Sequence, residues 1–295
     1  MNPRKQLIEA KKAYRRKDYL KSYELYREIY SPDFDASSKY SYAWAIYQAK
    51  VRDFESEDEL IENAELITTL TRQNDLTRTK LCVYTMAAFK VIRLLFENGE
   101  YEDLPRWLDK INPDLLDEVR FTRNGKVYPS KREQYYLYAS KTYLELGNYE
   151  KCVRVSKRAL GTMTRFTGDN AMWLQWRIAK SLRQLEDYEE SLRYLAEVKK
   201  VHRDWYVEKE IAENYFFMGD YEMSLTYALK SALNLGPADA KFNLYTLLYD
   251  LLINTHPEYA RKHERLCEMI RNGEIEGKSR LEGELEEIWK ELGGE

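Results

Sequence analysis

The chain has 295 residues, of which 33% are charged and 44% are hydrophobic. This length exceeds one typical globular core, so we expect either two domains or one elongated repeat array. The hydrophobic content excludes a disordered chain, and the net charge of -3 gives no global case for binding nucleic acid or an anionic membrane. Glycine and proline are few, and the long segments between them favour helix.

From the first residues of the chain we expect no targeting signal. Residues 1–5 run straight into an amphipathic segment, without the apolar stretch of a signal peptide. No run approaches the roughly 18 uninterrupted apolar residues of a membrane span. We therefore expect a soluble, cytoplasmic protein without membrane contact. Cys82, Cys152 and Cys267 each lie in a helical pattern and form no paired framework, so we expect reduced, structural cysteines.

A short turn phrase that ends in tyrosine recurs along the chain, each time after one amphipathic segment and before another. In chain order its tyrosines are Tyr19, Tyr101, Tyr149, Tyr188 and Tyr221. The last three are 39 and 33 residues apart, which is the spacing of a helical solenoid. In each phrase, glycine or a polar residue closes one helix, and in most Asp or Asn begins the next.

The flanks of these turns repeat as well. Nine residues before the turn tyrosine, and again three residues after it, most copies have a small side chain. These positions hold Ala10, Ser140, Ala179 and Ala212 before the turn, and Ser22, Cys152, Ser191 and Ser224 after it. Tyr143 and Tyr215 stand six residues before the turn tyrosine, and Pro237 follows the last of these pairs. This set of positions resembles the tetratricopeptide repeat, whose unit is an antiparallel helix pair of about 34 residues.

The resemblance implies an all-α, right-handed superhelical solenoid of about seven such pairs, forming a single array over residues 1–295. Its predicted parts are divergent repeats at 4–118, a hairpin or loop insertion at 119–129, the clearest repeats at 130–236, a divergent repeat at 237–272 and a C-terminal capping helix at 273–295. The divergent pairs are expected at 38–52 with 58–72, 76–97 with 101–111, and 238–254 with 257–272.

The insertion is predicted to be a β-hairpin. From Val119 to Tyr128 apolar and polar residues alternate around Asn124-Gly125, which is the strongest short hairpin signal. An inert insertion is the favoured interpretation, and a binding element on a functional face is the alternative.

Catalytic patterns are missing from the sequence. There is no phosphate-binding glycine loop, no G-x-S-x-G and no C-x-x-C. His263 and Cys267 are four residues apart on one helix face, with His256 seven residues before the first, so a metal site can be imagined. Packing residues near a helix start are the favoured interpretation. We therefore predict a non-enzymatic protein without a metal or cofactor.

The resemblance places the first helix of each pair on a concave face that usually binds peptides. Eight residues before the first four of these turn tyrosines the chain has a basic residue, and aromatic and basic side chains are expected beside this ladder. The predicted groove consists of Lys11, Arg93, Lys141, Trp173, Trp176, Lys180, Arg183, Phe216 and Phe217. Such a groove suits a protein or peptide partner with carboxylate groups, through charge-assisted hydrogen bonds and cation–π contacts.

Three alternatives to this interpretation stay open. The same groove suits single-stranded nucleic acid, whose bases stack on aromatic rings. The basic residues can also be neutralised by acidic residues of neighbouring helices. Finally, the chain can be a self-assembling structural module, with the C-terminal helix or the hairpin as the contact between copies. The C-terminal helix carries one apolar stripe that either folds back as a cap or is offered to a second subunit; its residues are Leu281, Leu285, Ile288, Trp289 and Leu292.

Overall fold

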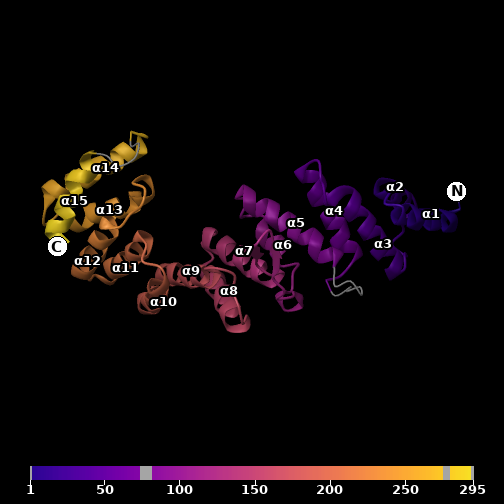
Figure 1. The fold of residues 1–295 in the computed structure, drawn as a ribbon, viewed down its shortest axis with the longest axis horizontal. Coiled ribbons are helices and arrows are strands. Elements are labelled where there is room, and N and C mark those ends of the chain that lie inside the picture. Colours follow the sequence, from indigo (N-terminus) through magenta and orange to yellow (C-terminus); the bar gives the residue numbers. More distant parts are fainter. Residues whose placement is uncertain (1, 74–81, 275–279, 294–295) are drawn as a thin grey trace. The chain divides into compact units, whose positions relative to one another are not determined.

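The computed structural model describes residues 2–73, 82–274 and 280–293, and the chain within these ranges is almost entirely helical (Figure 1). The helices form two compact units, residues 1–146 and residues 147–295. Each unit is considered by itself below.

The first unit consists of successive helices with a short hairpin near its end. The elements are α1 (Pro3–Arg15), α2 (Tyr19–Ile29), α3 (Ala36–Ile46), the π-helical segment η1 (Tyr47–Val51), α4 (Glu57–Leu70), α5 (Val83–Asn98), α6 (Leu104–Leu108), the 3-10 turn η2 (Pro113–Leu115), β1 (Phe121–Arg123), β2 (Lys126–Tyr128) and α7 (Lys131–Glu145). Helix α1 packs on α2, and α4 packs on both α3 and α5.

In its described residues, the second unit has helices as its regular secondary structure and no strand. Its elements are α8 (Tyr149–Thr162), α9 (Asn170–Gln184), α10 (Tyr188–Val201), α11 (Trp205–Met218), α12 (Tyr221–Leu233), the 3-10 turn η3 (Asp239–Lys241), α13 (Phe242–Leu252), α14 (Pro257–Arg271) and α15 (Arg280–Gly293). Helix α9 packs on α8 and α10, α11 on α12, and α13 on α14. The prediction of an all-α fold built from helix pairs is therefore confirmed. Whether both units form one continuous right-handed array stays a prediction.

The recurring turns have one backbone geometry. The residue two positions before each turn tyrosine has a positive φ, whether it is glycine, as at Gly219 (81°), or not, as at Lys17 (65°) and Glu186 (63°). At four of these five turns the next residue then caps the following helix; at the Tyr101 turn, α6 begins later, after Asp103. At the start of α12, for example, the Asp220 carboxylate accepts a hydrogen bond from the Met223 N–H.

The small positions around each turn bring the two helices of a pair together. The hydroxyl of the serine after the turn donates a hydrogen bond to the backbone carbonyl of the alanine before it. The distances are 3.0 Å from Ser22 to Ala10, 2.8 Å from Ser191 to Ala179 and 2.9 Å from Ser224 to Ala212. All six residues are buried. A larger side chain at either position would separate the helices and break this bond.

Several predicted boundaries differ from the structure. The helix expected at 76–97 begins at Val83, and its predicted start falls in 74–81, outside the described residues. The helix expected at 101–111 is reduced to α6, which has Pro105 in its first turn. The helix expected at 38–52 changes to π-helical geometry at Tyr47, and the one expected at 238–254 begins only after the 3-10 turn η3.

The predicted hairpin is confirmed. Strands β1 and β2 pair antiparallel, with Phe121 opposite Tyr128 and Arg123 opposite Lys126. Asn124 and Gly125 both have positive φ, 52° and 74°, which is the backbone of a type I′ turn.

The C-terminal helix α15 covers the end of the second unit. It packs on α12 and α14, and its side chains Leu285, Ile288 and Trp289 are buried in the core of that unit. The Trp289 ring stacks on Tyr245 at 5.9 Å between centroids. The stripe that was considered for a second subunit is therefore already covered by the chain's own helices.

Two further properties concern the described residues. Cys82, Cys152 and Cys267 are free thiols and are buried. Across the described ranges, no helix combines the length and the apolar character that crossing a membrane requires.

Candidate functional site

The predicted groove residues of the first unit lie on three first helices of pairs. Lys11 is half-buried on α1. On α5, Arg93 is exposed and forms an ion pair with Glu97 at 2.7 Å, one helical turn further along the same helix. On α7, the Lys141 ammonium lies 5.6 Å from the centre of the Phe96 ring. The structure thus joins Lys141 to an aromatic side chain but leaves Arg93 with a carboxylate of its own helix.

In the second unit, α9 presents Trp173, Trp176, Lys180 and Arg183 along one side, spaced three, four and three residues apart. The two indole rings meet edge to face at 5.8 Å. The Lys180 ammonium lies 4.6 Å from the centre of the Trp176 ring, which is a cation–π contact. The predicted combination of basic and aromatic side chains is therefore present on this helix.

Helix α11 completes this surface. Tyr206, which was not among the predicted groove residues, stacks on Trp173 with 5.9 Å between ring centres. Phe217 lies under the Arg183 guanidinium at 5.8 Å. Phe216 instead packs partly into the core of the C-terminal helices. We call these side chains of α9 and α11 the α9–α11 face; they are the predicted Trp173, Trp176, Lys180, Arg183, Phe216 and Phe217, together with Tyr206.

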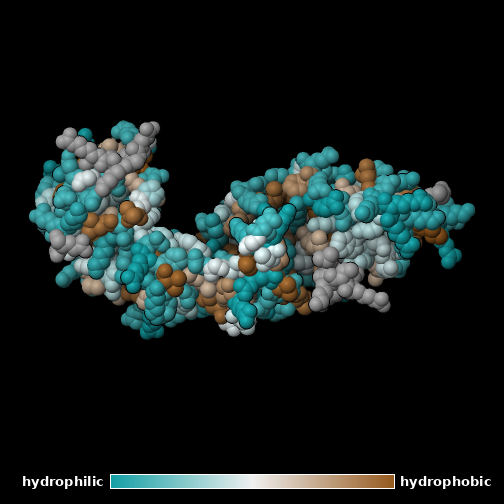
Figure 2. All heavy atoms as spheres, viewed as in Figure 1, coloured by the Kyte–Doolittle hydropathy of each residue, from teal (hydrophilic) through white to brown (hydrophobic). Residues whose placement is uncertain are grey.

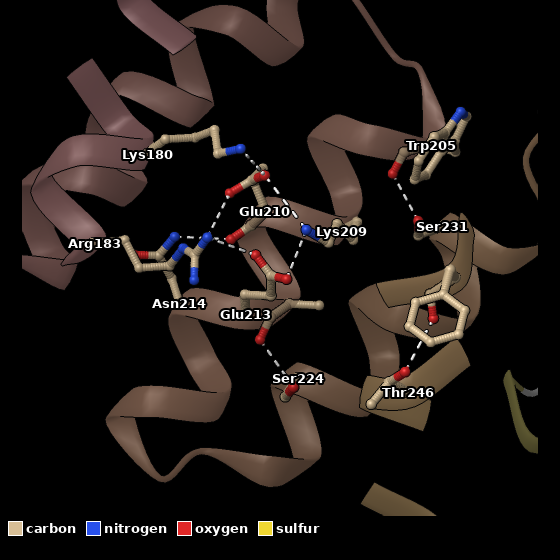
Figure 3. Close-up of polar contacts among 12 residues, drawn as sticks. Lys180, Arg183, Trp205, Lys209, Glu210, Glu213, Asn214, Ser224, Ser231 and Thr246 are labelled. Carbon is tan, nitrogen blue, oxygen red and sulfur yellow. Dashed lines mark hydrogen bonds and ion pairs between the residues drawn. The ribbon is translucent and has the colours of Figure 1, made fainter. Parts of the chain in front are cut away.

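Between the two helices the cations of this face are held by glutamates (Figure 3). Glu210 of α11 accepts ion pairs from Lys180 at 3.6 Å and from Arg183 at 3.2 Å. Glu213 lies 2.8 Å from Arg183 and 2.6 Å from Lys209. These five side chains form one network of three cations and two carboxylates, which we call the α9–α11 ion network.

Burial and charge act on the two glutamates in opposite directions. Burial alone would raise the pKa of Glu210, but Lys209, Lys180 and Arg183 together hold that pKa below its ordinary value. Glu213 has fewer cations around it, so burial and the neighbouring Glu210 carboxylate raise its pKa. Glu210 is therefore the permanent counter-ion of the network.

The network decides which cations a ligand can reach. The Arg183 side chain is only 9% exposed, whereas Lys180 is 30% exposed and borders the tryptophans. Among the described side chains, the buried Arg183 Nε–H and the Asn214 amide oxygen beside it have no hydrogen-bond partner. Lys180 and the aromatic rings are thus the accessible part of this face.

The residues considered for a metal site are occupied by packing interactions. His263 is buried; its Nδ1 lies 2.8 Å from the Tyr259 carbonyl oxygen, and its Nε2 accepts a hydrogen bond of 2.9 Å from the Trp289 indole. Burial lowers the pKa of His263 to about 4, so the ring is neutral. Burial also raises the pKa of the Cys267 thiol. In residues 2–73, 82–274 and 280–293, no group of three metal-ligating side chains is placed to hold an ion.

A cavity of about 340 Å³ lies at the end of α12, between the loop that follows this helix and α15. Its lining includes Lys241, Glu282 and Trp289. The Lys241 ammonium is buried and donates hydrogen bonds to the carbonyls of Ala232 at 3.0 Å and Asn234 at 2.5 Å. This cation therefore closes the C-terminal end of α12, where helix dipole and free carbonyls favour positive charge.

Comparison with known proteins gives likeness of structure only. No protein-family model and no curated protein matches the sequence. The apo form of RapI is similar over 100% of this chain and 82% of its own, with 13% identity and a TM-score of 0.50. A tetratricopeptide repeat protein from Parabacteroides merdae covers 99% of this chain and 97% of its own, with 15% identity and a TM-score of 0.44. A MamA RS-1 double mutant covers 64% of this chain and 96% of its own, with 14% identity and a TM-score of 0.48.

At such low identity, similarity concerns the fold alone, and it agrees with the helix pairs, turns and small positions described above. The chain thus has the fold of the tetratricopeptide-like helical-repeat proteins.

Proposed function

We propose that this chain is a non-enzymatic adaptor or scaffold that binds a segment of another protein on the first helices of its repeats. The observation that carries the proposal is the α9–α11 face, where Trp173, Trp176 and Tyr206 pack together next to a partly exposed Lys180. Aromatic side chains beside a cation are typical of the energetically dominant part of a protein interface. Because the rings are already packed in place, a ligand would not need to order them.

The chemistry of this face suits a ligand that carries both an apolar side chain and a carboxylate. The tryptophans offer apolar area. Lys180 offers an ammonium whose one ion pair within the described part of the chain is the long contact with Glu210, at 3.6 Å. Arg183 is committed to Glu210 and Glu213, so it supports the face more than it attracts a ligand. In the first unit, Lys11, Arg93 and Lys141 are the corresponding contacts. We therefore expect preference for an acidic segment with moderate sensitivity to salt.

The test compares two matched double variants as bait for partners in a native cell lysate. Lys180→Gln/Phe217→Ala removes the accessible cation and an exposed ring of the face, while Lys200→Gln/Val201→Ala removes an exposed cation and apolar side chain at the end of α10. We expect the first variant to lose a protein that the wild type and the second variant both retain. Circular dichroism and thermal unfolding establish that both variants are folded.

Two results would contradict the proposal. Retention of the same partner proteins by Lys180→Gln/Phe217→Ala would show that the α9–α11 face is not the binding surface. Recovery of nucleic acid that is released steeply as salt rises would favour the alternative ligand, since each phosphate contact releases counter-ions on binding.

A further inference from the structure

Two exposed aromatic patches of opposite charge lie outside the α9–α11 ion network, one in each unit. On the side of the molecule drawn in Figure 2, hydrophobic residues form small separate areas within a mainly hydrophilic surface. Most exposed large apolar side chains of a protein need no explanation when they are scattered singly. Those at the β1–β2 hairpin and those at the α11–α12 turn are instead grouped. Exposed cations lie on the hairpin face, and exposed carboxylates lie at the turn.

The first patch is one face of the hairpin. Phe121, which is 51% exposed, stacks on Tyr128 with ring centres 4.8 Å apart and ring planes within 2°. Because side chains alternate along a strand, Arg123 and Lys126 lie on this same face, and the Lys126 ammonium is 5.7 Å from the Tyr128 ring. Both cations are exposed. We call Phe121, Arg123, Lys126 and Tyr128 the hairpin patch.

Two acidic residues next to the hairpin are already paired with another cation. Asp114 and Glu118 precede the strands, and both pair with Arg132 of α7, at 3.4 Å and 2.7 Å. A hairpin of two three-residue strands is also only marginally stable in water and adds little to the stability of the fold. An aromatic pair with an exposed Phe121 on such an element is therefore better explained by contact with another molecule than by folding.

The second patch surrounds the turn between α11 and α12. Tyr221 is 60% exposed, and Phe217 and Met218 are exposed beside it. Tyr188, from the preceding turn, stacks on Phe217 with ring planes within 6°. The two turns place five exposed carboxylates next to these side chains; they are Glu186, Asp187, Glu189, Asp220 and Glu222. We call these aromatic, apolar and acidic side chains of the two turns, from Glu186 to Glu189 and from Phe217 to Glu222, the turn patch.

We propose that the hairpin patch of one copy of this chain docks on the turn patch of a second copy. The argument is complementarity: a stacked, partly exposed aromatic pair with two exposed cations meets accessible aromatic and apolar side chains with five exposed carboxylates. Opposite charges around apolar centres fix the partner and its orientation. The turn patch shares Phe217 with the α9–α11 face, but the charged residues that the test below changes all lie outside that face.

The contact joins two different surfaces, so it is heterologous. Each copy that uses its hairpin patch leaves its own turn patch open for another copy. Such contacts build a ring when the rotation between copies closes and a filament when it does not. Assembly is therefore expected to grow with protein concentration beyond a dimer, and to weaken with salt because its charged groups are solvent-exposed.

Sedimentation velocity over a concentration series tests the proposal with two charge reversals. Variant H, Arg123→Glu/Lys126→Glu, gives the hairpin patch the sign of the turn patch; variant T, Glu189→Lys/Glu222→Lys, does the converse. These side chains are exposed, and the helix-capping residues Asp187 and Asp220 are left in place. The control is Lys5→Glu/Lys21→Glu, which changes the net charge by the same amount as variant H at exposed positions of α1 and α2.

We expect the wild type and the control to associate. The affinity of self-association of H alone, and of T alone, should be lower than that of the wild type by a factor of about ten or more. In an equimolar mixture, the acidic hairpin of H meets the basic turn of T, so H and T should associate with each other. A wild type that stays monomeric at its highest soluble concentration overturns the proposal, as does association that H and T retain. Association that disappears after nuclease treatment overturns it as well, because nucleic acid would then be the link.

Discussion

Acid is expected to loosen the C-terminal cap of the second unit through His263. The buried imidazole is neutral, and its Nε2 accepts the hydrogen bond from the indole N–H of Trp289 on α15. A protonated imidazole has no lone pair for that bond. Because Nε2 accepts, Nδ1 carries the hydrogen and donates to the Tyr259 carbonyl. Protonation therefore removes a hydrogen bond of the cap and places an uncompensated charge beside its largest side chain.

The sign and size of the effect follow from the pKa. Burial lowers the pKa of His263 to about 4 in the folded chain, whereas an unfolded histidine has an ordinary value of about 6.5. Between these values the unfolded state binds more protons, so stability is full above pH 6.5 and is lost as pH falls towards 4. Since one pKa unit corresponds to about 1.4 kcal/mol, the complete loss is about 3 kcal/mol, and about 2 kcal/mol of it falls between pH 7 and pH 5.

Two measurements test this prediction. The chain has three histidines, so their ring signals can be followed separately by NMR, and His263 should stay neutral until about pH 4. Hydrogen exchange of α15, compared at each pH between the wild type and His263→Gln, cancels the intrinsic pH dependence of exchange. Protection in the wild type should fall more steeply with acid than in the variant, whose amide can keep both hydrogen bonds without titrating. Parallel profiles, or a His263 that titrates near 6.5, would refute the reasoning.

Three substitutions at helix ends and turns give further predictions, each read by thermal unfolding. Gly236→Ala should destabilise the protein by about 1–3 kcal/mol, because a Cβ atom there would lie 2.5 Å from the Trp205 ring. The control is Gly161→Ala in α8, where an added Cβ meets open space, and it should stabilise the protein by about 0.5–1 kcal/mol. Ser224→Ala should cost about 1 kcal/mol for the lost interhelical hydrogen bond, and Ser224→Val should cost more because it also separates the helices. Glu186→Gly should stabilise by about 0.5–1 kcal/mol, since glycine adopts its φ of 63° without strain; a loss of stability would contradict this.

The repeat architecture could be predicted from the sequence because the turn tyrosine and its small neighbours have fixed offsets. The same offsets identified Ser191 and Ser224 as small residues that allow close packing, but not as hydrogen-bond donors to the opposite helix. The offset of a residue from the turn tyrosine indicates that its side chain must be small. The hydrogen-bond partner of its hydroxyl depends instead on how the two helix backbones approach each other. The boundaries of α5 and α6 were harder to predict because their turn keeps its tyrosine while Leu104 takes the small position.

The basic ladder was predicted residue by residue, and the α9–α11 ion network shows what that procedure misses. Lys180 was identified by its offset from the turn tyrosine, but its counter-ion, Glu210, lies 30 positions further along, on another helix. A pattern within one helix carries no information about that pairing. The sequence alone therefore placed Lys180 and Arg183 together as cations of the groove, whereas in the structure the buried Arg183 pairs with both Glu210 and Glu213.

Arg183 and Lys180 should consequently differ when each is changed to Met. Arg183→Met removes the shortest of the three ion pairs of the buried Glu210. Lys209 and Lys180 still face this carboxylate, so the cost should be about 3 kcal/mol, at the low end for removing one partner of a buried pair. Lys180→Met keeps the apolar contact with Trp176 and removes only a long, partly exposed pair, so its cost should stay below about 1 kcal/mol. Urea unfolding of the two variants separates the cases. Equal costs would mean that Arg183 is a surface cation like Lys180, and that it is free to bind a ligand as the sequence first suggested.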